Sequence, residues 1–489
     1  MSDVSLAPGV RDATGADDPR AFDLIVIGAG SGNSIVGPEL AGSRVALLDD
    51  GEWFGGTCLN AGCIPTKMFV HVADVVTDVD QGDSIGVHSH PSRPSWPEVR
   101  DRVFGRIDSI SDSGLDYRAH RSENVTLYRE SFGFESLGDG ARPHVLVSAS
   151  GERISAPTVV IAAGSRPRPL LATYDPDPRI HDSSSIMRID ELPERMVILG
   201  GGAVGVEFAH VFSAFGTAVT VAVRGDRLLR SLDEGIGRRF TRIVGERYDV
   251  RTGAIAESID SRADALVVSF DDGTEVETDI VLVALGRDPN SDTVAAAAVG
   301  IDLHPDGRIA VDTEQRVLSG GKPIPGLFAL GDVSSEWQLK HVANHEARIV
   351  AHNLLHPEEL LSNTLSPVPG AIFAHPQIAH FGLTEAEALA AGIEVVAVTQ
   401  EFGSTAYGWA LEDDSSVCIL VVGLDGELLG AHIMGPQASI LIQPLIQAAS
   451  AGVGIRGLAR SQYWPHPAAS EVVENALLSA EEALRERTT

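Results

Sequence analysis

Short apolar runs that end in glycine recur along the chain. Each run holds four to six uncharged residues, the pattern of a strand that is buried on both faces of a parallel sheet. With their glycines, the runs occupy residues 24–28, 159–164, 196–200, 280–286 and 327–331. Because strands and turns alternate throughout residues 155–335, the pattern favours doubly wound α/β sheets over all-helical or all-β architectures.

The first run leads into a glycine-rich turn, after which we expect a helix. Gly28 and Gly30 fill the first two positions of a G-x-G-x-x-G pattern. Asn33 stands at the third position, with Gly32 beside it. Such glycines let backbone N–H groups approach a pyrophosphate at a helix N-terminus, so the turn indicates a dinucleotide site.

A second glycine turn follows the strand at 195–199. Gly200, Gly202 and Gly205 match the full pattern, and an apolar helix and the strand at 218–223 come next. The chain therefore repeats the strand–turn–helix–strand arrangement of a dinucleotide-binding unit.

The strands that follow the two turns are each followed by charged side chains, acidic after the first turn and basic after the second. The strand after the first turn ends in Asp49 and Asp50, and we favour Asp49, the first acid, as the carboxylate that binds a ribose hydroxyl. The strand after the second turn is followed by Arg224, with Arg230 six residues on. Guanidinium groups bind a 2′-phosphate, so the second site is interpreted as an NADPH site. The alternative is that both arginines are solvated surface charges.

Three further strands end in glycine. The strand in FALGD ends in Gly331 and Asp332, which places a carboxylate at the edge of a sheet, where it suits a polyol such as a ribityl chain. The strands at 159–163 and 280–285 end in Gly164 and Gly286.

Two of the three cysteines in the chain, Cys58 and Cys63, lie five positions apart. In a regular helix, residues at this spacing are offset by about 7.5 Å along the axis, so a bridge between them requires a distorted segment. Together with two dinucleotide sites, a dithiol indicates an electron relay from nicotinamide to flavin to disulfide. Lys67 would stabilise a reduced flavin, with Glu207 as its counter-ion. A zinc site is the alternative, but only Cys418 remains as a further thiol ligand.

The other end of such a relay needs an acid and base for thiol exchange. Near the C-terminus, the sequence predicts that Pro467 opens a helix, with His466 before it and Glu471 in its first turn. A glutamate within reach of the imidazole would orient it and raise its pKa. A purely structural role of His466 is the alternative.

Composition narrows the range of partners. The net charge of -31 over 489 residues disfavours nucleic acid and anionic membranes as partners, and no apolar run reaches the length that spans a bilayer. Residues 1–20 lack the pattern of a signal peptide and are expected to form a disordered tail. With three cysteines, the reducing cytoplasm is the expected compartment, and no metal is expected.

Taken together, the motifs carry a family resemblance. The two glycine turns, GGTCLNAGCIPTK (55–67), FALGD (328–332) and HPAASE (466–471) follow one another along the chain. In this combination the chain resembles the FAD-dependent pyridine nucleotide–disulfide oxidoreductases of the glutathione reductase and dihydrolipoamide dehydrogenase type. The resemblance covers nearly the whole chain.

This resemblance implies an α/β fold class, with two doubly wound, Rossmann-like nucleotide-binding domains and an α+β C-terminal dimerisation domain. The implied segments, after the tail, are an FAD-binding domain (21–165), an NADPH-binding domain (166–290), a central part that completes the FAD domain (291–364) and a dimerisation or interface domain (365–489).

The resemblance also implies site residues. Cys63 would be the thiolate next to the flavin and Cys58 the thiol that exchanges with substrate. His466 and Glu471 would act across the interface of a homodimer. The expected FAD-binding residues are Gly28, Gly30, Gly32, Asp49, Gly56, Thr57, Lys67, Gly164, Gly331 and Asp332. The expected NADPH-binding residues are Gly200, Gly202, Gly205, Arg224, Arg230 and Gly286.

Within the family, stretches such as GSGNSI (30–35) and LKHVANHEARIV (339–350) are similar to the enzymes that reduce mycothiol disulfide. The resemblance therefore implies this small molecule as the substrate. Open alternatives are a dihydrolipoamide dehydrogenase, which Arg224 and Arg230 disfavour, and a reductase of another low-molecular-weight disulfide. A flavoprotein without turnover and a zinc-binding structural protein are alternatives from other classes.

Overall fold

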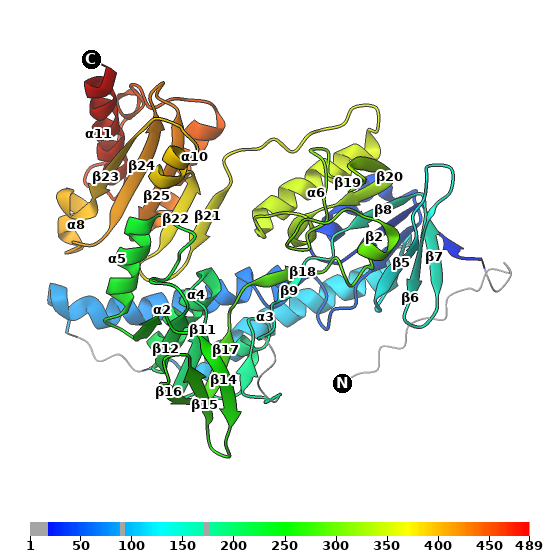
Figure 1. Ribbon diagram of the computed structural model, residues 1–489, viewed down its shortest axis with the longest axis horizontal. Helices are drawn as coiled ribbons and strands as arrows, with labels where there is room; N and C mark the ends of the chain where they lie inside the picture. The colour runs from blue at the N-terminus through cyan, green and yellow to red at the C-terminus, as the bar shows by residue number, and fades with distance from the viewer. Residues whose placement is uncertain (1–17, 89–92, 171–175, 489) are drawn as a thin grey trace. The chain divides into compact units, whose positions relative to one another are not determined.

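The computed structural model describes residues 18–88, 93–170 and 176–488 (Figure 1). The chain forms two compact units. Unit 1 consists of Met1–Phe54, Gly114–Gly164 and Pro289–Asn363, and unit 2 consists of Gly55–Ser113, Ser165–Asp288 and Thr364–Thr489. Residues 1–17 of the predicted tail lie outside the described residues, whereas Arg20, which the tail prediction included, is part of strand β1 (Arg20–Ala21).

Unit 1 is built on a six-stranded sheet whose central strands are parallel. All four residues of β2 are buried, as a continuous apolar run predicts for a strand covered on both faces. The strand order is β19 (Arg316–Ser319), β20 (Lys322–Ala329), β8 (Thr158–Ile161), β2 (Leu24–Ile27), β3 (Val45–Leu48) and β4 (Val125–Tyr128).

The two faces of this sheet have different covers. Helix α6 (Lys340–Leu355) packs on one face through Ala347 and Val350, which join Val26 and Leu47 in one core. The other face packs against a second sheet. That sheet has the strand order β1, β7 (Arg153–Ala156), β6 (His144–Ser148) and β5 (Phe132–Ser136).

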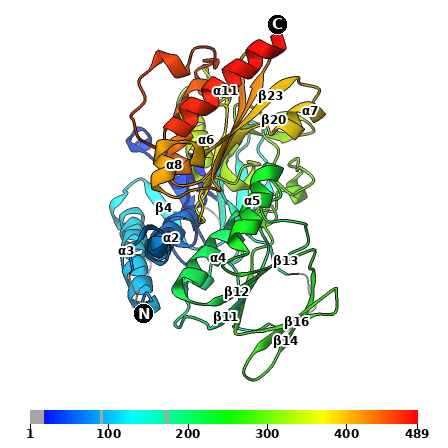
Figure 2. The same cartoon turned by 90° about the vertical axis from the view of Figure 1, so that its left-hand side faces the viewer.

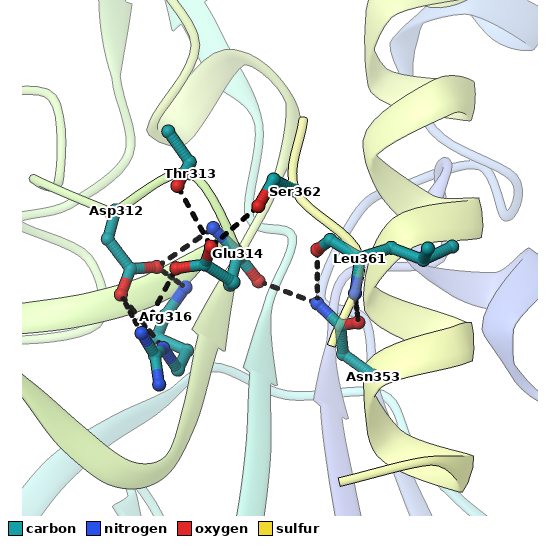
Figure 3. Close-up of polar contacts among 7 residues, drawn as sticks. All are labelled: Asp312, Thr313, Glu314, Arg316, Asn353, Leu361 and Ser362. Atoms are coloured by element: carbon teal, nitrogen blue, oxygen red, sulfur yellow. Dashed lines mark hydrogen bonds and ion pairs between the residues drawn. The ribbon is translucent and has the colours of Figure 1, made fainter. Parts of the chain in front are cut away.

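The C-terminal end of α6 is anchored by a buried asparagine (Figure 3). Asn353 donates from Nδ2 to the carbonyl oxygens of Glu314 and Leu361, both at 3.0 Å, and accepts from the Leu361 N–H at 2.7 Å. Ser362 donates to the Glu314 carboxylate at 2.6 Å. These bonds tie the helix to the loop before β19 and fix its position on the sheet.

Unit 2 contains a five-stranded, all-parallel sheet. Helix α4 (Ala203–Phe215) packs on one face through Phe208 and Phe212, together with α2 (Cys63–Gln81) and α3 (Trp96–Asp116). An antiparallel meander covers the other face. The sheet order is β10 (Ile180–His181), β17 (Ile280–Val283), β11 (Arg195–Leu199), β12 (Ala218–Val223) and β13 (Asp249–Thr252), and the meander is β14 (Ala256–Ser261), β15 (Leu266–Phe270) and β16 (Glu275–Thr278).

Unit 2 also holds an antiparallel sheet formed by the C-terminal part of the chain. Helix α11 (Glu471–Thr488) lies along this sheet beside β23, as Figure 2 shows, and buries Val472 and Leu477 against it. The strand order is β21 (Pro369–Ile372), β22 (Ile378–Gly382), β25 (Leu428–Met434), β24 (Val417–Gly423) and β23 (Val395–Glu401).

The remaining elements are short. Helices are α1 (Thr57–Asn60), α5 (Glu234–Val244), α7 (Glu385–Ala390), α8 (Ala406–Ala410), α9 (Ala438–Leu441) and α10 (Gln443–Ser450), and strands β9 (Ser165–Pro167) and β18 (Arg287–Pro289) form a two-stranded ladder.

These sheets confirm the predicted fold class, with two parallel, Rossmann-like sheets and an α+β C-terminal part. The second face of each parallel sheet is covered by a sheet rather than by helices. The division into FAD, NADPH, central and dimerisation segments stays a prediction.

Candidate active site

The two cysteines flank a break between two helices, as the sequence predicts. Cys58 lies in α1 and Cys63 is the first residue of α2, and both are thiols in this structure. Gly62 separates the helices with a non-helical backbone at φ -146° and ψ -125°. A Cβ built on Gly62 would lie 2.9 Å from the Thr57 carbonyl oxygen, so only glycine lets the second helix start so close to the first.

The Cys63 thiol has a lowered pKa. Its pKa falls to about 7, chiefly because the Cys58 side chain donates a hydrogen bond to it, and also because of the positive charge of Lys67. Burial and the charge of Glu207 act in the opposite direction. A thiol with this pKa is substantially thiolate near neutral pH, which makes it a nucleophile.

The predicted counter-ion of Lys67 lies next to it. The Lys67 Nζ is 2.6 Å from Oε2 of Glu207, whose side chain on α4 is only 9% exposed. The other carboxylate oxygen accepts the backbone N–H of Phe373 at 2.9 Å, and the ammonium lies 4.7 Å from the centre of the Phe373 ring. Phe373 therefore completes the ion pair, a contact that the sequence pattern does not reveal.

His466 and Glu471 form a pair, but the helix starts later than predicted. The His466 Nδ1 lies 2.5 Å from Oε1 of Glu471. Pro467 does not open α11, which begins at Glu471; residues 466–468 form a bend and residues 469–470 a turn before it. His466 is 70% exposed, and in the described part of the chain no hydrogen bond or ion pair joins it to Cys58 or Cys63.

The first glycine turn lies in unit 1. Gly28 has φ +104°, and a Cβ there would lie 2.3 Å from the carbonyl oxygen of Ala162, which directly follows β8. A Cβ on Gly32 would lie 2.6 Å from the Ala162 side chain, so Gly32 provides the close packing expected at a third glycine. Gly30, between them, belongs to the same turn.

The helix expected after this turn is absent, and the prediction was wrong there. Two 3-10 turns, η1 (Gly32–Ile35) and η2 (Pro38–Leu40), replace it. Pro38 lacks an N–H and disfavours a helical conformation at Gly37, so a continuous helix cannot form. Arg118 holds these turns, donating to the Asn33 side chain at 2.8 Å and to the carbonyl oxygens of Asn33 and Val36.

Asp49 and Asp50, the acids that follow β3, both contact other side chains of the protein. Asp49 forms an ion pair with Arg129 and accepts the Ala29 N–H at 3.3 Å, whereas Asp50 is exposed and bonded to Ser131. Burial raises the pKa of Asp49, and the charge of Arg129 opposes this shift.

Gly331 and Asp332 follow β20 in unit 1. Gly331 has φ +74°, and its N–H donates to Glu346 of α6 at 2.7 Å. Burial raises the pKa of Glu346 to about 7, and the charge of Asp332 adds to the shift. Gly164, with φ +68°, follows β8, and its carbonyl oxygen accepts the Asn290 N–H at 3.0 Å.

The second glycine turn lies in unit 2 and leads into α4. A Cβ on Gly200 would lie 2.3 Å from the Ala284 carbonyl oxygen, and one on Gly205 would lie 2.1 Å from the Gly200 carbonyl oxygen. A Cβ on Gly202, in contrast, meets no atom within 4 Å. Packing within the protein does not require glycine at 202, so the open turn fits the close approach of a dinucleotide.

Arg224 and Arg230 are exposed after β12. The segment that carries Arg230 is tied to the turn, because the Leu229 N–H donates to the Gly201 carbonyl oxygen at 2.8 Å. Among the described residues Arg224 forms no ion pair, and Arg230 has only a 4.0 Å contact with Asp226. Both guanidinium groups are therefore available to an anion at this turn. Gly286, φ +111°, follows β17.

Sequence reasoning missed Arg118, Arg129 and Phe373. Of these three, only Arg129 could have been found from the sequence. It directly follows β4, and β4 pairs in parallel with β3, the strand that ends before Asp49. The side chains that follow neighbouring parallel strands meet at one edge of a sheet.

Within residues 18–88, 93–170 and 176–488, no three His, Cys, Asp or Glu side chains are grouped to hold a metal ion. None of the helices described there combines the length and apolar character needed to traverse a bilayer.

The chain is similar to known proteins along most of its length. Residues 22–347 match the family model described as pyridine nucleotide-disulphide oxidoreductase, and residues 368–477 match its dimerisation domain. Mycothione reductase of Mycobacterium tuberculosis is 47% identical, over 94% of this chain and 99% of that protein. Dihydrolipoyl dehydrogenase of Chlamydia trachomatis is 32% identical, over 95% and 98%.

Solved structures share the fold. The HOCl-induced flavoprotein disulfide reductase RclA from Escherichia coli, as its Cu(II) complex, superposes with a TM-score of 0.80 at 24% identity, over 94% of this chain and 99% of that one. LpdA from Mycobacterium tuberculosis gives 0.79 at 23%, over 96% and 100%. The chain therefore belongs to the pyridine nucleotide-disulphide oxidoreductases, enzymes that use a flavin and a pyridine nucleotide in disulfide chemistry.

Proposed function

We propose that this enzyme uses NADPH and bound FAD to reduce mycothiol disulfide to two molecules of mycothiol. The observation that carries the proposal is the Cys58–Cys63 dithiol, in which the pKa of Cys63 is about 7 and Lys67 is paired with Glu207 nearby in the same unit. The choice of substrate is supported by the 47% identity to mycothione reductase, against 32% to a dihydrolipoyl dehydrogenase.

In the proposed reaction the two thiols act in sequence. The Cys58 sulfur attacks the substrate disulfide and forms a mixed disulfide, releasing the first mycothiol. The Cys63 thiolate then attacks the Cys58 sulfur, releases the second mycothiol and leaves a Cys58–Cys63 disulfide. FAD, when bound, supplies the transfer of two electrons from NADPH that restores the dithiol. The balance is one NADPH and one proton consumed for each disulfide reduced.

Proton transfer is assigned to His466. With Nδ1 directed to Glu471, the other ring nitrogen can accept the proton of Cys58 and return it to the departing thiolate. His466 forms no bond to the cysteines of its own chain in the described residues. A homodimer, which the dimerisation-domain match supports, would let His466 of one subunit serve the cysteine pair of the other.

A cytoplasmic location of the enzyme belongs to the same proposal.

The residues assigned to FAD occur in both units, whereas those assigned to NADPH occur in unit 2. In unit 1 the first glycine turn, Gly164, Asp49, Gly331 and Asp332 are assigned to FAD. In unit 2 the second turn, Gly286, Arg224 and Arg230 are assigned to NADPH, and Gly56, Thr57 and Lys67 to FAD. Lys67 would place a positive charge at the flavin, held in position by Glu207 and Phe373.

The lowered pKa gives a prediction about pH. In the reduced protein, site-resolved alkylation of Cys63 should reach half its maximal rate at about pH 7 and fall as the pH is lowered further, because protonation removes the thiolate. The Lys67→Gln variant should shift this midpoint upward, since a positive charge is lost. Cys418 is an internal control, because burial raises the pKa of its thiol to about 12. A wild-type midpoint at the ordinary thiol value would contradict the assignment.

The test of the function is a comparison of NADPH oxidation with mycothiol disulfide, glutathione disulfide and lipoamide. We expect turnover with mycothiol disulfide to be the fastest. A preference for lipoamide or glutathione disulfide would refute the substrate. The His466→Gln variant should slow disulfide turnover by roughly 10²–10⁴-fold while flavin reduction by NADPH continues. Equal loss of both half-reactions would refute the acid–base role.

A further inference from the structure

Helix α6 brings a lysine to the first glycine turn. Lys340 is the first residue of α6, and its Nζ donates a hydrogen bond to the Ser31 hydroxyl at 2.7 Å. Ser31 in turn donates to Oδ1 of Asn344, one helical turn further along α6, at 3.2 Å. Ser31 follows Gly30 within the turn, so the helix places an ammonium directly on the segment that carries the glycines.

Local electrostatics do not explain why a cation lies there. A positive charge in the first turn of a helix is unfavourable, because the N-terminal end of the helix dipole is itself positive. The first turn of α6 contains no acidic residue, and in the described part of the chain Lys340 forms no ion pair. Lys67, by comparison, has a buried carboxylate at 2.6 Å. The charge of Lys340 is thus uncompensated by the protein, although it is partly buried.

The position of Lys340 is set by the rest of the helix. Asn353 anchors the other end of α6 (Figure 3), and Ala347 and Val350 pack its middle on the sheet. The packing of the helix therefore determines where the ammonium of Lys340 lies. It is presented there by a helix that is fixed at both its middle and its end.

We propose that Lys340 is an FAD-binding residue whose ammonium neutralises the diphosphate of the cofactor at the first glycine turn. This inference rests on the proposed function, which assigns that turn to FAD. A glycine turn supplies backbone N–H groups but no net charge, and a diphosphate carries negative charge that a protein with net charge -31 must balance locally. Hydrogen bonds to charged groups are stronger than those between neutral groups, so the lysine adds affinity that the turn alone lacks.

The test compares FAD release from purified full-length variants. Lys340→Gln should release FAD about 10- to 100-fold faster than the wild type when followed by flavin fluorescence after dilution. Lys340→Arg keeps the charge and should stay close to the wild type. Lys322→Gln is the matched control, because Lys322 is an exposed lysine of the same unit on β20, and it should behave as the wild type. Far-UV circular dichroism checks that each variant is folded.

The dependence of FAD release on salt concentration distinguishes a charge effect of Lys340 from a packing effect. The difference between wild type and Lys340→Gln should shrink as ionic strength rises, because screening weakens the ammonium–phosphate attraction. Release from Lys340→Gln at the wild-type rate would overturn the proposal. Equally fast, salt-independent release from Lys340→Gln and Lys340→Arg would also overturn it, in favour of a packing role. Wild-type protein that binds no FAD would instead refute the proposed function itself.

Discussion

The two glycine turns have the same backbone geometry but different surroundings. In unit 1 the N–H of Gly28 donates to the carbonyl oxygen of Leu48, and a Cβ on Gly28 would lie 2.3 Å from the Ala162 carbonyl oxygen. In unit 2 the N–H of Gly200 donates to the carbonyl oxygen of Ala222, and a Cβ on Gly200 would lie 2.3 Å from the Ala284 carbonyl oxygen. The close approach arises from a strand that turns sharply between two parallel neighbours, which leaves room for glycine alone.

The segments after the two turns differ. The second turn continues into the thirteen-residue helix α4, whereas the first continues into 3-10 turns held by Arg118. The acid after β3 is neutralised by Arg129, while Arg224 after β12 has no ionic partner among the described residues. The turn geometry is thus common to both units, whereas the following segment and the charges around the turn differ between them.

The strongest test of this comparison removes the shared glycine from one turn at a time. Gly28→Ala should weaken flavin binding and keep NADP⁺ binding, and Gly200→Ala should do the reverse. Each change forces a side chain against a carbonyl oxygen at positive φ, a strain of about 1–3 kcal/mol, so the affinity for the nucleotide of that turn should fall about tenfold or more. Flavin absorbance and calorimetry of NADP⁺ binding measure the two effects.

Gly151→Ala and Gly253→Ala are matched controls for these variants. Both glycines have positive φ, +88° and +69°, but a Cβ on either meets no atom within 4 Å. They should keep both nucleotides. If Gly28→Ala or Gly200→Ala stayed folded yet lost both nucleotides, the two turns would not be independent sites.

A smaller effect is expected from the charges after β12. The double variant Arg224→Gln/Arg230→Gln should raise the KM for NADPH by about 5- to 10-fold and leave that for NADH nearly unchanged, because NADH lacks the 2′-phosphate. Arg242→Gln, which changes an exposed arginine of α5, is the control and should alter neither. Unchanged preference in the double variant would mean that the two arginines are surface charges.

The sequence predicted the features that arise from local pattern. The buried strands, both glycine turns and the break between Cys58 and Cys63 follow from apolar runs and from where glycine stands, and the structure has all of them. The Lys67–Glu207 contact joins residues 140 positions apart, and it was anticipated from the charge that a relay needs, not from pattern.

The features that escaped prediction depend on distant partners. Phe373 and Arg118 reach their sites only through the tertiary fold, and nothing near them in sequence marks those contacts. The missing helix after the first turn has a local cause, because Pro38 disfavours a helical conformation at Gly37. The helix was predicted there from the glycine pattern alone. A prediction from a motif is therefore most accurate for the backbone of the motif and least accurate for the side chains that pack on it.

The smallest expected effect concerns the third motif position, where Asn33 replaces glycine. In unit 2, Gly205 is required because its Cβ would collide with the Gly200 carbonyl oxygen, but in unit 1 Gly32 provides the close packing and Asn33 binds Arg118. Asn33→Gly, which restores the motif, should therefore lower stability by about 1–2 kcal/mol and give no gain in flavin affinity. Thermal unfolding and flavin release measure the two quantities. Asn33→Ala separates the causes, since it removes the hydrogen bond without adding backbone freedom and should account for most of the loss. Tighter flavin binding in Asn33→Gly would contradict this interpretation. It would show that Asn33 weakens flavin binding at the first turn and is not needed to support the 3-10 turn.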